Sequence, residues 1–196
     1  MTTATIAGFR KVPLLPHPAC PAGPLRALSV SAQLSAAGLL NLDYELRGNL
    51  ARIRLAPKVS HPQRRDGLWN HTCLELFARG GQGSSYLEFN FSPSGDWAVY
   101  RFEEYRSGQS ACQQRQIGVT MHAIGADRLR VQACADLDAL SADAGTEAPD
   151  AASLGWLFNP AAVIEAGDGS LSYWAAHHGG ARPDFHAAAG CRVAAR

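Results

Sequence analysis

Aromatic and acidic side chains in the middle of the sequence are the first candidates for chemistry. The segment Tyr86–Phe91 alternates strictly between apolar and polar positions, which is the period-2 pattern of a half-buried strand. One side carries Leu87 and two phenylalanines, and the other side carries Tyr86, Glu88 and Asn90. Such a face suits a polar ligand that also has an apolar side, and a sugar is a common molecule of this kind.

A second strand is predicted directly after the first, over Trp97–Phe102, with the turn Ser92–Asp96 between them. We expect every second residue of this strand, starting at Ala98, to face the core. That register places Arg101 on the polar face, directly opposite Glu88. The guanidinium would keep Glu88 ionised and unsuited to general-acid work, so we expect both residues to bind ligand.

Trp69 and Glu75 form a second group of candidates, where a loop becomes a strand. An exposed indole offers a flat apolar plate on which a pyranose ring can stack, and Glu75 can accept two hydroxyl hydrogen bonds. The alternative is structural: Trp69 caps the core and Glu75 pairs with an arginine. Glu75 and Glu88 also resemble the carboxyl pair of a glycosidase, but the pairing with Arg101 argues against hydrolysis, and we predict no enzyme.

A third group lies near the C-terminus, in Ser172–His186, which is dense in side chains able to bind a ligand. Its candidates are Trp174, His178, Asp184 and His186. The spacing of its histidines fits no standard metal site, because adjacent residues of a strand point to opposite faces. We predict structural histidines and no bound metal. Haem is an alternative cofactor, with Met121 as its available axial ligand beyond the initiator methionine.

The length and charge of the chain limit the classes of function. A chain of 196 residues with 46% apolar content supports one well-buried domain. Lysine plus arginine number 18 against 17 for aspartate plus glutamate, which does not favour nucleic-acid or membrane-surface binding. The N-terminus lacks a basic start followed by an apolar run, so we expect a cytoplasmic protein. Five cysteines without CxxC spacing argue against a disulfide framework or a thiolate zinc site.

The elements that must position these side chains are short strands. Residues 1–24 hold five of the eleven prolines, so we expect an extended N-terminal arm without regular structure, followed by one domain over residues 25–196. From Leu25 onward, strand-like runs recur between turn residues, which predicts an all-β fold, an antiparallel β-sandwich or jelly roll. A few short helical turns are expected, near Leu137–Leu140 and at Asn159–Glu165, where Asn159 is a candidate N-cap followed by Pro160.

Several motifs in order resemble the bacterial DOMON-like proteins, relatives of the family 9 carbohydrate-binding modules. They are Leu68-Trp69-x-x-Thr72-Cys73-Leu74-Glu75-Leu76-Phe77, the hairpin Tyr86–Phe102, Ser172-Tyr-Trp-Ala175 and Pro183-Asp-Phe-His186. The resemblance implies a β-sandwich that binds sugar or haem. It also implies that a ligand lies between two tryptophans and that a glutamate and an asparagine hold its hydroxyls.

The match to those family residues is uneven along the chain. Trp69 and Glu75 have the expected spacing and Asn90 matches the asparagine, whereas Glu88 stands where the family has a basic side chain. The second tryptophan would be Trp174, with Trp156 as the alternative. We therefore predict non-catalytic binding of a carbohydrate or related polyol in a cleft on one sheet. The alternatives are a haem-binding redox module and a protein-interaction sandwich without a small ligand.

Overall fold

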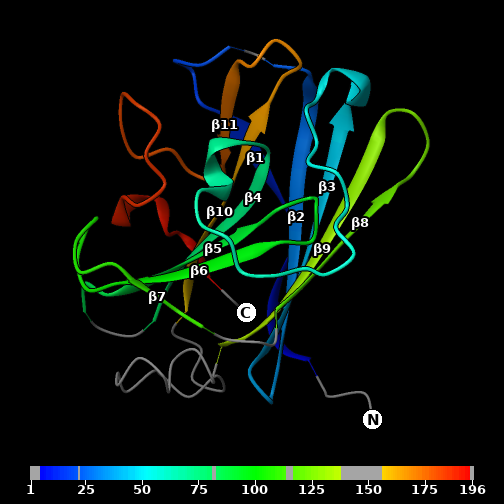
Figure 1. The fold of residues 1–196 in the computed structure, drawn as a ribbon. Helices are drawn as coiled ribbons and strands as arrows, with labels where there is room; N and C mark the ends of the chain where they lie inside the picture. Colours follow the sequence, from blue (N-terminus) through cyan, green and yellow to red (C-terminus); the bar gives the residue numbers. More distant parts are fainter. Residues whose placement is uncertain (1–4, 22, 81–82, 114–116, 138–155, 195–196) are drawn as a thin grey trace.

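The computed structural model describes residues 5–21, 23–80, 83–113, 117–137 and 156–194. These residues form an antiparallel β-sandwich, which confirms the predicted all-β fold (Figure 1). Helical structure includes short 3-10 turns, namely η1 (Leu50–Arg52), η2 (Leu68–Asn70) and η3 (Ala188–Gly190). The predicted turn at Leu137–Leu140 and the loop after it lie mostly outside the described residues.

Two sheets, which we name sheet A and sheet B, form the sandwich. Sheet A has the spatial order β1 (Thr5–Pro16), β2 (Leu25–Ser35), β3 (Leu39–Gly48), β9 (Arg128–Asp136) and β8 (Gly118–Ala123). Sheet B has the order β7 (Ser110–Ala111), β6 (Trp97–Phe102), β5 (Tyr86–Phe91), β4 (Cys73–Arg79), β10 (Leu157–Glu165) and β11 (Leu171–Ala175), and β12 (Val193–Ala194) pairs with β10. In Figure 1 the β5–β6 hairpin lies across the long strands of sheet A.

Strand β1 belongs to both sheets. Most of it pairs with β2, and its last two residues, Leu15 and Pro16, pair with β11. The expectation that residues 1–24 lack regular structure is therefore wrong for Thr5–Pro16. The strand tolerates Pro13 because its missing N–H falls close to the point where β1 leaves β2 and begins to pair with β11. Burial of apolar residues such as Leu14 in the core holds the strand in place.

The main core lies between the two sheets and follows from strand alternation. Inward positions of β3 and β5 are apolar, and Tyr44 of β3, which is fully buried, donates its hydroxyl hydrogen bond across the sandwich to the backbone oxygen of Glu75 over 2.8 Å. This bond joins sheet A to the middle of β4. It fixes the backbone of Glu75 while the Glu75 side chain points to the opposite face of sheet B.

A second apolar cluster covers the outer face of sheet B, and we name it the outer cluster. Residues 176–192, named here the C-terminal segment, fold over this face and contribute Phe185 and Cys191 to it. The sheet contributes Phe77, Tyr86, Ala98, Tyr100, Phe102, Ala161, Val163 and Ala175. Both faces of sheet B are therefore largely buried, and the candidate site lies on the outer one.

The register of the β5–β6 hairpin differs from the prediction by one residue. Glu88 lies opposite Tyr100, and Arg101 lies opposite Leu87 on the other face. The cause is the turn: the Ser92 N–H donates to the Asp96 carbonyl, and Gly95 adopts a positive φ of 103°. A shift of one residue moves every side chain of the second strand to the opposite face, so Arg101 leaves the polar face.

The segment Asn159–Glu165 is a strand, and the predicted helix there is wrong. It forms most of β10, which pairs with β4 from Leu157 to Val163. Pro160 lies between the residues that pair with β12 and those that pair with β11, where a missing N–H removes no ladder bond on that side. Pairing on both sides of the strand therefore decides the structure of this segment against the local helix-start signal.

None of the five cysteines forms a disulfide, and Cys73 and Cys191 are buried. Among the described residues, no helix is long and apolar enough to cross a membrane.

Candidate functional site

A pocket of about 350 Å³ lies on the outer face of sheet B. Its floor, as we use the word below, consists of Glu75 and Phe77 from β4 and Glu88 from β5, whose side chains alternate outward. Trp69 of η2 and Phe185 of the C-terminal segment also line it. Strand alternation directs these side chains outward, and the pairing of β4 with β5 brings them together. Across this ladder Glu75 pairs with Asn90, and Phe77 pairs with Glu88.

Glu75 is buried in the pocket floor without a partner for one of its oxygens. Only 2% of the residue is exposed, and Oε1 makes no hydrogen bond within the described structure. Burial, with the nearby Glu88 carboxylate, raises the pKa of Glu75 well above its usual range. Burial therefore favours the protonated form of this carboxyl in the free protein. A buried polar atom left without a partner is costly, so a ligand that pairs with Oε1 would be favoured here.

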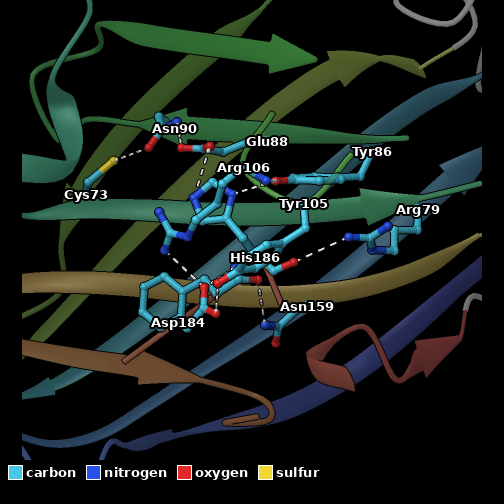
Figure 2. Close-up of polar contacts among 11 residues, drawn as sticks. Cys73, Arg79, Tyr86, Glu88, Asn90, Tyr105, Arg106, Asn159, Asp184 and His186 are labelled. Atoms are coloured by element: carbon cyan, nitrogen blue, oxygen red, sulfur yellow. Dashed lines mark hydrogen bonds and ion pairs between the residues drawn. The ribbon is translucent and has the colours of Figure 1, made fainter. Parts of the chain in front are cut away.

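Glu88 is buried beside Glu75 but has partners. Its Oε1 accepts a hydrogen bond of 2.8 Å from Asn90 Nδ2, and the Cys73 thiol lies 3.6 Å from Asn90 Oδ1 (Figure 2). Burial raises the pKa of Glu88, and the hydrogen bond from Asn90 and the positive charge of Arg106 lower it in part. Asn90 thus lies behind the floor and orients the Glu88 carboxyl.

His186 connects the C-terminal segment to the floor through a hydrogen-bonded chain. The backbone N–H of Arg106 donates to the Tyr86 hydroxyl at 3.2 Å, and the same hydroxyl lies 2.7 Å from His186 Nδ1 (Figure 2). On the other side of the ring, His186 Nε2 lies 3.7 Å from Glu88 Oε2. Burial, with the positive charge of Arg106, lowers the pKa of His186 to about 4.

We expect His186 to remain neutral down to about pH 4. NMR titration of the imidazole resonances, assigned with the His186→Gln variant, measures this pKa directly. The physical reason is burial against Phe77 and Phe102, whose ring centroids lie 4.9 and 5.1 Å from the imidazole. A pKa near the ordinary histidine value of about 6.5 would mean that water reaches the imidazole and that the pocket wall is open.

An ion pair and several hydrogen bonds anchor the C-terminal segment against sheet B. Asp184 accepts hydrogen bonds from Arg106 Nη2 at 3.0 Å, from the Tyr105 hydroxyl at 2.8 Å and from the His186 N–H at 3.1 Å. Arg79 lies over the Tyr86 ring and donates to the His186 carbonyl at 3.3 Å (Figure 2). These bonds bring residues far apart in the sequence into one wall of the pocket.

Aromatic surfaces supply the apolar part of the lining. Trp69 is 37% exposed and packs edge-on against Tyr100 with centroids 5.7 Å apart. Tyr173 of β11 and Phe185 also line the pocket, with centroids 6.1 Å apart. The pocket therefore combines aromatic rings, of which Trp69 is exposed, with buried carboxyl groups.

Seven of the ten predicted site residues lie in or directly behind this pocket. The four that line it are Trp69, Glu75, Glu88 and His186. The three that form the polar network behind it are Tyr86, Asn90 and Asp184.

The other three predicted residues lie elsewhere. Arg101 is on the inner side of sheet B because of the hairpin register. Trp174 is 3% exposed in the core between the sheets, where its indole N–H donates to Ser172 Oγ at 3.1 Å. Trp156, the alternative second plate, is also buried in that core. His178 Nε2 donates to the backbone oxygen of Leu15, 2.8 Å away, and His178 is not among the pocket residues.

Sequence reasoning missed Arg106, Tyr173 and Phe185, all of which line the pocket. Alternation in β11 could have identified Tyr173. The next residue, Trp174, points into the core, so the Tyr173 side chain must point to the opposite face of sheet B. Phe185 lies between two predicted residues of the same segment. Arg106 has no sequence signal, because it reaches the pocket from a turn in which its own φ is 52°.

The described residues contain no group of three or more histidine, cysteine, aspartate or glutamate side chains placed to hold a metal ion. Met121, the candidate haem ligand, lies in β8 of sheet A and packs against the core between the sheets. It is therefore not part of the pocket on sheet B.

Comparisons with known proteins agree with this architecture at the level of the fold. No protein-family model matches the sequence, and no curated protein matches it. The structure is similar to that of a solved protein described as a "putative carbohydrate-binding protein from Bacteroides uniformis". The TM-score is 0.64 at 13% sequence identity, and the match covers 94% of this chain and 84% of the other. The two proteins share a β-sandwich fold, and the resemblance to DOMON-like proteins stays a prediction.

Proposed function

We propose that this protein binds a carbohydrate or a related polyol, without catalysis, in the pocket on sheet B. The observation that carries the proposal is the unpaired Oε1 of Glu75, buried in a pocket that an exposed tryptophan also lines. A sugar presents hydroxyl groups that can pair with a carboxyl and C–H faces that can stack on aromatic rings. The pocket volume is in the range of small-molecule sites, and the fold is shared with a protein described as carbohydrate-binding.

The positions of the two glutamates favour binding over hydrolysis. Glu75 and Glu88 project from neighbouring strands of one sheet face, so both approach a ligand from the same side. Glycosidases instead need two carboxyl groups that flank the scissile bond, one of them ionised. Burial raises the pKa of both glutamates and so disfavours the ionised form that a nucleophile or a base needs.

The test is a thermal-shift and tryptophan-fluorescence screen against neutral, amino and acetylated sugars, followed by calorimetry on those that respond. We expect Kd values between micromolar and millimolar, because one stacked ring and a few hydrogen bonds contribute about 1 kcal/mol each. Trp69→Ala should raise Kd roughly fivefold through loss of stacking worth about 1 kcal/mol.

Trp174→Phe is the matched control for Trp69→Ala, because Trp174 is buried between the sheets and away from the pocket. It should leave the affinity unchanged although it removes an indole. Equal losses in the two variants would contradict the assignment of the site. No saturable response to any sugar would overturn the proposal, and a Soret band on addition of haem would favour the haem alternative instead.

A further inference from the structure

The charged side chains around the pocket are unevenly distributed: the two glutamates belong to the floor, and the arginines lie in the wall. Glu75 and Glu88 belong to the floor, whereas the carboxylate of Asp184 lies in the wall with the guanidinium groups of Arg79 and Arg106. Glu75 and Glu88 are 2% and 5% exposed. The floor therefore holds two buried acidic groups side by side.

The two guanidinium groups are engaged in the wall. Arg106 pairs with Asp184 at 3.0 Å. Arg79 donates to the backbone oxygens of Ser84 and His186 and lies over the Tyr86 ring. Arg106 is near enough to act on the pKa of Glu88, but Oε1 of Glu75 has no hydrogen-bond partner in the described structure. Positive charge at Glu75 is thus left for a ligand to supply.

Building on the proposed function, we propose that the pocket selects sugars that carry a primary ammonium group, with the ammonium bound against Glu75 and Glu88. An ammonium group donates three hydrogen bonds and carries the charge that two neighbouring buried carboxyl groups attract most strongly. A hydroxyl group supplies one donor and no charge. An N-acetyl group supplies one N–H and adds bulk where the floor is acidic.

The remainder of the lining favours an organic cation over a hydrated metal ion. Phe77, Phe102 and Tyr173 line the same pocket, and aromatic faces attract ammonium groups attached to an apolar body. A metal ion would need several oxygen ligands in a closed shell, whereas Glu88 Oε1 is already bonded to the Asn90 amide.

The groups that face the two carboxyls set the size of the expected preference. Those around Glu75 are Glu88, Cys73 and Tyr173, and Tyr44 acts on Glu75 from the inner side of the sheet. Those around Glu88 are Asn90, Arg106, His186, Tyr86, Tyr100 and Cys73. Burial favours the protonated form of Glu75, which offsets part of the gain from binding an ammonium group. We therefore expect about a tenfold lower Kd for the amine, the size of one charge-assisted hydrogen bond.

Calorimetry on the full chain at pH 7 tests this with sugars that differ only at carbon 2. The probes are glucose, glucosamine and N-acetylglucosamine, with the corresponding galactose and mannose sets. In at least one set the amine should bind about tenfold more tightly than both relatives. Glu75→Gln should reduce this ratio to near one, since glutamine keeps the shape but cannot ionise to pair with an ammonium group. Glu88→Gln serves the same purpose if the first variant does not fold. Glu45→Gln, on the outer face of sheet A, should leave the ratio unchanged.

The outcomes separate the inference from the proposed function. If neutral or acetylated sugars bind and no amine binds more tightly, the ammonium inference is overturned and carbohydrate binding stands. If the preference survives both Glu75→Gln and Glu88→Gln, the ammonium is not bound where we place it and the inference is also overturned. If no sugar binds here or in the wider screen, both proposals fail.

Discussion

Replacement of Glu75 by glutamine is expected to stabilise the protein above pH 7, although it removes a charged group of the candidate site. Burial raises the pKa of Glu75 in the folded state, so the folded chain binds this proton more tightly than the unfolded chain. Below the unfolded pKa of about 4.3 both states are protonated, and the group contributes nothing to the pH dependence. As the pH rises, the unfolded state ionises first and stability is lost until the folded pKa is passed.

Glutamine does not titrate, so the variant escapes this loss. We expect the difference in unfolding free energy to be small at pH 4 and to reach on the order of 2 kcal/mol at pH 8, the usual cost of a buried group without a partner. Urea unfolding of both proteins at pH 4, 6 and 8 measures it.

Glu45→Gln is the control with the opposite sign. The guanidinium of Arg47 lowers the pKa of Glu45, so this carboxylate stabilises the fold slightly when ionised. Its loss should reduce stability a little at pH 8, and this effect should shrink as the pH falls through the lowered pKa of the folded state. If Glu75→Gln destabilised the protein more at pH 8 than at pH 4, Glu75 would be ionised and paired in solution, contrary to the structure.

Phe77→Ala is expected to have the largest effect on stability and to open the pocket wall. Phe77 is 2% exposed, and its ring centroid lies 4.9 Å from His186 and 6.1 Å from Phe185. Truncation of such a ring costs about 3–5 kcal/mol. Because Phe77 is the surface on which the C-terminal segment packs, water should reach His186, and the histidine pKa should rise from about 4 toward its ordinary value.

Phe89→Ala separates the two effects, because Phe89 is fully buried on the inner side of the neighbouring strand. It should cost a similar free energy of unfolding but leave the pKa of His186 near 4. Urea unfolding and NMR titration measure the two quantities. Phe77→Leu and Phe89→Leu replace the alanine variants if either fails to fold. An unchanged His186 pKa in both Phe77 variants would show that the wall does not depend on Phe77.

The location of the pocket follows from a sheet that is buried on both faces. The inner face of sheet B packs against sheet A, and the C-terminal segment covers part of the outer face. Where that cover ends, outward side chains of β4 and β5 remain beside the exposed Trp69. A buried but unpaired carboxyl is then possible, because the surrounding strands hold it away from water.

Local sequence patterns predict most of the strands and most of the polar residues near the pocket. Alternation in Tyr86–Phe91 predicts correctly that Glu88 and Asn90 share a face, because successive side chains of a strand point to opposite sides. The same local rule would have placed Tyr173 opposite Trp174. The all-β sandwich likewise follows from short apolar runs between turn residues.

The partners of those residues depend on contacts between distant parts of the chain. The turn before Trp97 sets the hairpin register, and one residue of shift moves Arg101 to the inner face. Pairing on both sides makes a strand of Asn159–Glu165 despite its helix-like start. Arg106 reaches the pocket through contacts with Asp184, far along the chain. Alternation is a local property of the backbone, whereas register and long-range contacts depend on the packing of the whole sandwich.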